Sequence, residues 1–154
     1  MPIAPINSER WDFASGINGE LKEEIGWPEL VETVATLYAG LPGDKSQVGI
    51  LTSNYGEAGA INLYGQAYGL PQAISGINSY WLRGYGDPPP QTLIVLGFSS
   101  VEAYRVFESC QPAGLITNRY GVRNEETRDH PVILVCGKPR ESWPEAWKRL
   151  QSFG

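Results

Sequence analysis

The sequence predicts an α/β fold: a three-layer, Rossmann-like sandwich whose mostly parallel sheet has about five strands, with one antiparallel strand at the end. Three observations lead to this prediction. Strand-sized apolar runs alternate with segments of helical spacing as far as the fourth expected strand. The run from Thr92 to Phe98 is apolar nearly throughout, which is typical of a strand covered on both faces. The polar stretch after Thr117 lacks helical periodicity, so we expect the last two strands to pair antiparallel.

The first half of the chain is expected to run helix, strand, helix, strand. The first helix begins near Pro28, because proline is favoured at the first helical position, and it ends at Gly40. Its apolar residues recur with helical spacing. A strand from Ser46 to Ser53, a helix from about Tyr55 to Gly69 and a short strand from Gln72 to Ser75 follow.

The second half begins with a loop, residues 76–90, that is rich in aromatic residues and glycine. After the third strand, Ser99 and Glu102 have the spacing of a capping box, which opens a third helix. The fourth and fifth strands are expected over 113–117 and 131–136. Ser142 and Glu145 repeat the capping-box spacing at the start of the last helix.

These elements are expected to form one domain. A chain of 154 residues has a common size for a single domain, and its 42% hydrophobic residues supply a core. Residues 1–20 are polar and punctuated by proline and glycine, so we interpret them as a leader. Residues 21–154 are then the single α/β domain.

Composition and charge exclude several functional classes. The net charge is −5 and no run of Lys or Arg is present, so nucleic-acid binding is not expected. No apolar run approaches the roughly 20 residues of a membrane helix, so we expect the chain itself to be soluble. Two cysteines and one histidine fall short of the ligands of a zinc site. We therefore expect no metal site and no cofactor.

The sequence contains none of the named catalytic motifs. It has no GxGxxG, no GxxxxGK[ST], no GxSxG and no HExxH. His130 is the one histidine that could act as a base for a serine or cysteine nucleophile, and we interpret it as a loop residue beside the fifth strand. No catalytic residue is therefore predicted.

A first candidate ligand site lies between the first strand and the second helix, at Asn54, Tyr55 and Glu57. In open α/β sheets, ligands bind beyond the carboxyl ends of the strands, where helix amides also favour anions. The alternative is structural, because Asn54 and Glu57 stand three residues apart and match a capping box.

A second candidate follows the second strand and comprises Asn78, Ser79, Tyr80 and Trp81. Aromatic faces beside amide and hydroxyl groups are typical of sugar and lipid-headgroup sites, and equally of a lid packed over a core. We expect both candidate segments to emerge at one edge of the sheet and to form its largest concave polar site.

Cys110 and Cys136 are expected to lie close together, because the last two strands should pair antiparallel. A disulfide between them would close a loop worth about 3 kcal/mol. The alternative is that Cys136 is a small buried hydrophobic residue and Cys110 a free loop thiol. The sequence leaves both interpretations open.

Several segments of the chain resemble a known family. The stretches NYGEAGAINLYG (54–65) and YGLPQAISG (68–76) are similar to the segment that follows the last membrane helices of bacterial glycosyltransferase family 39, the dolichyl-phosphate-mannose–protein mannosyltransferase type. The segment EIGWPEL (24–30) and the closing strand and helix (135–150) also resemble that family. The chain departs from the pattern at Ile77, where the family has a histidine, and at Trp81 to Gly84.

The resemblance implies a role in sugar transfer from a polyprenyl-phosphate donor on the extracytoplasmic face. The family's catalytic carboxylates lie near its first membrane helices, which this chain does not contain. The chain is then a non-catalytic extramembrane domain that contributes substrate or acceptor recognition or stability, with residues 1–20 linking it to the membrane-embedded part of the parent transferase. That part is the implied partner, and a sugar or polyprenyl-phosphate headgroup the implied ligand. The alternative is a stand-alone Rossmann-like protein that binds a sugar or nucleotide.

Overall fold

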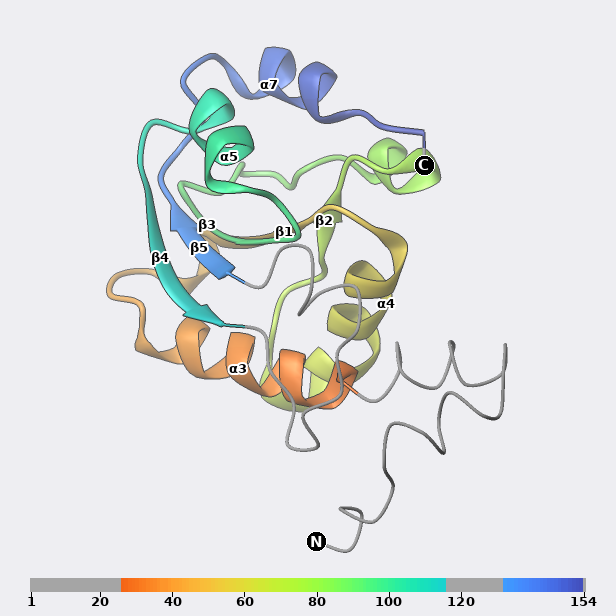
Figure 1. Cartoon of the computed structure of the whole chain (residues 1–154), viewed down its shortest axis with the longest axis vertical. Coiled ribbons are helices and arrows are strands. Elements are labelled where there is room, and N and C mark those ends of the chain that lie inside the picture. The colour runs from red at the N-terminus through yellow and green to blue at the C-terminus, as the bar shows by residue number, and fades with distance from the viewer. Residues whose placement is uncertain (1–25, 116–131, 154) are drawn as a thin grey trace, which may run out of the picture.

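A five-stranded sheet lies at the centre of the structure, and helices cover both of its faces (Figure 1). The computed structural model describes residues 26–115 and 132–153, so the expected leader and His130 lie outside the described residues. The strands stand in the order β2-β1-β3-β5-β4. Their bounds are Val48–Thr52 (β1), Ile74–Ser75 (β2), Thr92–Leu96 (β3), Cys110–Leu115 (β4) and Val132–Cys136 (β5).

The sheet is mixed, and the expectation of a mostly parallel, Rossmann-like sheet is wrong. β1 pairs in parallel with β2 and β3, but β5 pairs antiparallel with both β3 and β4. The antiparallel strand therefore lies inside the sheet and not at its end. The reason is visible in the two strands: β5 is largely buried, whereas β4 is largely exposed and carries Pro112. Because proline cannot donate a ladder hydrogen bond, a strand that contains it is confined to an edge or a bulge.

β4 begins earlier than the expected strand over 113–117. It starts at Cys110, and its register with β5 shifts between Pro112 and Gly114. The segment Gln111–Gly114 reads as a turn because it contains both proline and glycine, and only its pairing with β5 makes it a strand. Positions 116, 117 and 131 of the expected strands lie outside the described residues.

Within residues 26–115 and 132–153, two helices pack on each face of the sheet (Figure 1). α3 (Trp27–Gly40) and α4 (Tyr55–Tyr64) cover one face, and α5 (Ser100–Val106) and α7 (Trp143–Leu150) cover the other. Successive side chains of a strand point to opposite faces, so Ile50 packs under α3 and α4 while Leu51 packs under α5 and α7. This double coverage explains why the inner strands are continuous apolar runs.

The expected capping box forms completely at the start of α5, and only its Ser142 half forms at the start of α7. Ser99 and Glu102 form the capping box of α5, and the hydroxyl oxygen of Ser142 accepts the Glu145 N–H at the start of α7. Three short 3₁₀ helices complete the described part of the chain: η1 (Lys45–Gln47), η2 (Gly65–Tyr68) and η3 (Asn78–Arg83). None of the helices in the described part of the chain is long and apolar enough to cross a membrane.

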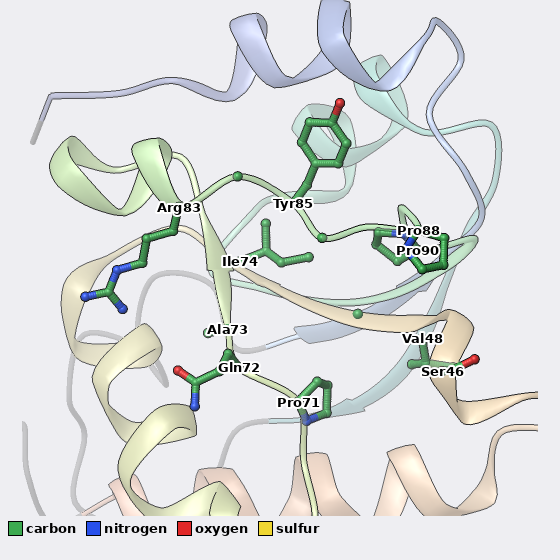
Figure 2. Close-up of a pocket in the computed structure, with 13 residues that line it drawn as sticks. Ser46, Val48, Pro71, Gln72, Ala73, Ile74, Arg83, Tyr85, Pro88 and Pro90 are labelled. Atoms are coloured by element: carbon green, nitrogen blue, oxygen red, sulfur yellow. The ribbon is translucent and has the colours of Figure 1, made fainter.

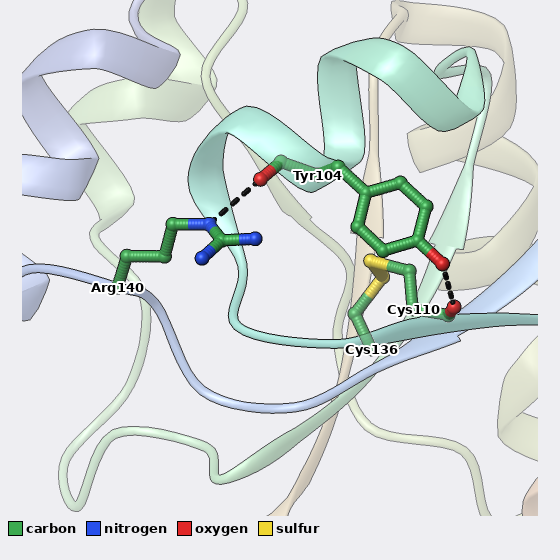
Figure 3. The surroundings of a disulfide bond; sticks show 4 residues. All are labelled: Tyr104, Cys110, Cys136 and Arg140. Carbon is green, nitrogen blue, oxygen red and sulfur yellow. Dashed lines mark hydrogen bonds between the residues drawn. A yellow bond between two sulfur atoms is a disulfide. The ribbon is translucent and has the colours of Figure 1, made fainter.

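Cys110 and Cys136 form a disulfide that joins β4 to β5 (Figure 3). The two residues stand directly opposite each other in the antiparallel ladder, and both are buried. The hydroxyl of Tyr104 donates to the Cys110 carbonyl at 2.7 Å, and Nε of Arg140 donates to the Tyr104 carbonyl at 2.7 Å. The disulfide thus lies in a connected unit that includes α5 and the segment before α7.

Candidate functional site

The segment after β1 uses its polar side chains to begin α4. Oδ1 of Asn54 accepts the Glu57 N–H at 2.8 Å. Oε1 of Glu57 accepts the backbone N–H groups of Ser53 and Asn54 at 3.1 and 3.4 Å, which completes a capping box. Glu57 is only 1% exposed. Its carboxylate therefore satisfies the start of a helix, as the structural interpretation of this segment holds.

Gly97, which follows β3, closes over the Glu57 carboxylate. Its φ of +81° lies in the left-handed region that favours glycine. A Cβ at this position would stand 2.3 Å from Oγ of Ser53 and 2.6 Å from Oε1 of Glu57. The ends of β1 and β3 thus approach each other closely around one buried carboxylate.

Tyr55 and Tyr80 bring the two predicted segments together at one edge of the sheet. Their ring centroids lie 5.8 Å apart, and the Arg83 guanidinium lies 4.6 Å from the Tyr80 ring centroid. Tyr55 is 47% exposed, so this group forms a surface rather than a buried contact. An aromatic surface with a stacked guanidinium can bind a sugar face or an anion-bearing partner.

Trp81 has a structural position. Its indole N–H donates to the Trp147 carbonyl at 2.8 Å, and its ring stacks on that of Trp147 with 6.4 Å between centroids. Tyr85 stacks on Trp143 with 4.8 Å between ring centroids and meets Trp147 edge-on. These four rings attach the η3 segment to α7. Trp81 therefore fits the structural alternative, in which the segment is a lid packed over the core.

Asn78 and Ser79 lie beside the end of the chain. The Asn78 N–H donates to the Ser152 carbonyl, and the Ser152 N–H donates to the Gly76 carbonyl, both at 2.8 Å. Ser79 is exposed. None of the seven predicted residues lines any of the three cavities described below. The expected crevice between the two segments is therefore not one of these cavities.

One cavity, of about 390 Å³, lies beside the edge strand β2 (Figure 2). Prolines and short side chains form much of its lining. Figure 2 shows Tyr85 directed toward α7 and Arg83 directed away from Pro88 and Pro90, in agreement with their contacts to Trp143 and Tyr80. Tyr85 and Arg83 are the lining side chains best suited to recognise a ligand, and both are engaged in other contacts. This cavity is therefore the weaker candidate for a ligand site.

The stronger candidate lies beyond the carboxyl ends of β1 and β3. A cavity of about 310 Å³ there adjoins a groove of about 760 Å³ between α5 and α7. The cavity and the groove share Phe98, Glu102, Arg149 and Leu150. α4 leaves β1 toward one face and α5 leaves β3 toward the other, so this is the point where ligands bind in open α/β sheets.

The charged residues of this groove were missed by reasoning from the sequence. Arg105, Arg140 and Arg149 are far apart along the chain, and only the packing of α5 against the segment that contains α7 gathers them. Arginines near the C-terminal end of a helix are also expected for a structural reason, because they interact favourably with the helix dipole. The sequence alone therefore does not single them out as binding residues. A hydrogen bond to the Glu141 carboxylate raises the pKa of the Arg149 guanidinium.

Comparisons with known proteins give no match, whether with family models, curated proteins or solved structures. Within residues 26–115 and 132–153, no group of three or more His, Cys, Asp or Glu residues is arranged to hold a metal ion.

Proposed function

We propose that this chain is a non-catalytic extramembrane domain of a membrane glycosyltransferase that uses a polyprenyl-phosphate sugar. It lies on the extracytoplasmic face and contributes substrate or acceptor recognition and stability. The proposal starts from the resemblance of residues 24–30, 54–76 and 135–150 to glycosyltransferase family 39.

The observation that carries the proposal is that these separate segments contact one another in the fold. Trp27, from the first segment, packs so closely on Gly56 that a Cβ there would stand 2.7 Å from its ring. Gly76 approaches the Leu150 carbonyl so closely that a Cβ would stand 1.8 Å from its oxygen. Both contacts are close enough that only glycine fits at these two positions. The segments that carry the resemblance therefore belong to one packed unit, which supports the proposal.

The disulfide supports the extracytoplasmic location. Disulfides form and persist in oxidising compartments and are rare in the cytosol. Cys110 and Cys136 are both buried and bonded to each other, which suits a domain that folds outside the cytoplasm.

Fractionation of the native protein tests the proposal. If the natural reading frame carries hydrophobic segments ahead of this domain, the protein will stay with the membrane fraction after an alkaline carbonate wash. Recovery in the soluble fraction would contradict the proposal and favour a stand-alone protein that binds a small ligand. The cavity beyond β1 and β3 is the observation that favours this second candidate.

A further inference from the structure

The surface around α4 is almost free of charge. Between residues 46 and 82 the sequence has one charged side chain, Glu57, and it is only 1% exposed. The same stretch holds five of the nine large hydrophobic side chains that are exposed in the described ranges: Tyr55, Leu63, Tyr64, Tyr68 and Leu82. Depletion of charge together with exposed aromatic residues is the composition of the centre of a protein–protein interface.

Gly59 lies in the middle of α4 without an internal reason for being glycine. A Cβ at Gly59 would meet no atom of the described residues within 4 Å. By contrast, a Cβ at Gly56 in the same helix would stand 2.7 Å from the Trp27 ring. Glycine is less favourable than alanine inside a helix. The packing of one copy therefore does not account for Gly59, whereas the close approach of another backbone does.

Tyr55, Gly59 and Leu63 form one outward stripe of α4. They stand four residues apart, so they lie on the same side of the helix. Tyr55 is 47% exposed and Leu63 is 69% exposed. The buried residues of α4 lie on its other side: Glu57, Ala58, Ala60 and Ile61. Gly59 therefore forms a notch between two projecting side chains.

A stripe with a small residue between two large ones is complementary to itself. When two copies of α4 cross antiparallel at Gly59, each Tyr55 lies against Leu63 of the second copy. Rows of residues four apart on two helices pack into each other's grooves at a crossing angle of about −50°. A glycine at the crossing lets the two backbones approach closely. Such a contact uses the same patch on both copies, as a two-fold dimer requires.

The charge of the chain also favours contact at this stripe. Each copy carries a net charge of −5, so two copies repel each other, and an uncharged stripe lets them meet without burying a charge. A lipid surface suits the stripe less well. Helices that lie on membranes carry Lys and Arg beside their apolar face, and α4 and η2 contain neither.

We propose that two copies of this chain form a symmetric dimer through α4, with Gly59 at the crossing point. Tyr80, whose ring centroid lies 5.8 Å from that of Tyr55, extends the contact to η3. The dimer follows from the surface of α4 and does not depend on the proposed glycosyltransferase function.

Sedimentation equilibrium of the 154-residue chain, from low micromolar to millimolar protein, tests the dimer. Because two crossing helices of ten residues form a small interface, we expect a monomer–dimer equilibrium with a Kd on the order of 10–100 µM. A chain that stays monomeric throughout would overturn the proposal. Binding of that monomer to phosphatidylcholine vesicles would assign the stripe to a membrane surface instead.

Gly59→Gln is the decisive variant, because its side chain fills the notch while its Cβ meets no described atom within 4 Å. Glutamine favours a helix more than glycine does, so the variant should fold, which urea unfolding at low micromolar protein checks. We expect the Kd of the dimer to rise roughly tenfold or more. Gly40→Gln is the matched control, since Gly40 is exposed at the end of α3 and its Cβ also has open space. An unchanged Kd in Gly59→Gln, or an equal rise in Gly40→Gln, would overturn the location.

Cysteine cross-linking tests the antiparallel arrangement. The native cysteines are bonded to each other, so Tyr55→Cys and Leu63→Cys each add one reactive thiol. Under mild oxidation we expect a mixture of the two variants to form more disulfide-linked dimer than either variant alone, because residue 55 faces residue 63 of the second copy. An equal or smaller yield from the mixture would overturn this arrangement.

Discussion

Trp81 and Trp147 hold each other by reciprocal hydrogen bonds between residues 66 positions apart in the sequence. The indole N–H of Trp81 donates to the Trp147 carbonyl at 2.8 Å, and the indole N–H of Trp147 donates to the Trp81 carbonyl at 3.0 Å. Their rings are almost parallel, with an interplanar angle of 6°. This pair fastens α7, and with it one wall of the groove, to the segment that follows β2.

The Trp81→Phe variant tests the importance of this pair. The change removes one indole donor and leaves the Trp147 carbonyl without that partner, so we expect the free energy of unfolding to fall by about 1–3 kcal/mol. Urea denaturation measures it. Tyr80→Phe is the control, because none of the hydrogen bonds described for this region involves its hydroxyl. Equal stability of the two variants would contradict the role of the pair.

A pair of glycine variants tests the contact between the family-like segments. In Gly76→Ala the new Cβ would meet the Leu150 carbonyl oxygen at 1.8 Å, so the backbone must move, and we expect a loss of about 3 kcal/mol. In Gly59→Ala the Cβ meets no atom within 4 Å inside α4, so we expect a gain of about 0.5–1 kcal/mol. Thermal or urea unfolding of both variants should give opposite signs. A neutral Gly76→Ala would mean that the end of α7 does not lie against β2 as described.

The Asn54→Ala variant tests the capping role of this segment. Loss of the cap should lower the free energy of unfolding by about 1 kcal/mol, as at other helix starts. Ser99→Ala, at the equivalent position of α5, is the comparison for stability. Unchanged stability of Asn54→Ala would contradict the capping role.

Removal of the disulfide should destabilise the domain without changing its fold. The bond closes a loop with a sequence separation of 26, for which the chain-entropy estimate is about 3 kcal/mol. We expect the Cys110→Ala, Cys136→Ala double variant to unfold at a correspondingly lower urea concentration. Thiol titration of the unaltered protein under denaturing, non-reducing conditions should find no free thiol at these positions. Two free thiols would contradict the bridge and weaken the case for an oxidising compartment.

The sequence was most informative where the governing interaction is local. The spacings Asn54/Glu57 and Ser99/Glu102 predicted capping boxes because both partners lie within one helical turn. The antiparallel pairing of the last two strands, and with it the closeness of Cys110 and Cys136, followed from the absence of a crossover helix in the pattern.

Other features depend on which strand is neighbour to which, and local patterns do not encode this. β5 inserts between β3 and β4, so the sheet is mixed and the last of the five strands in chain order is an inner one. Trp81 read as a ligand-binding aromatic because its partner, Trp147, lies in a distant helix. Arg105 and Arg140 showed no sequence signal, since their proximity arises only when α5 packs beside the segment before α7.

Labelling of the parent protein in intact cells tests the central claim most directly. Ser100 is exposed at the start of α5, so Ser100→Cys provides a reactive thiol, and the two native cysteines are bonded to each other. A membrane-impermeant maleimide should label this variant in intact cells as fully as in permeabilised ones. Labelling that requires permeabilisation would place the domain in the cytoplasm and contradict its assignment as the extracytoplasmic domain of a membrane glycosyltransferase.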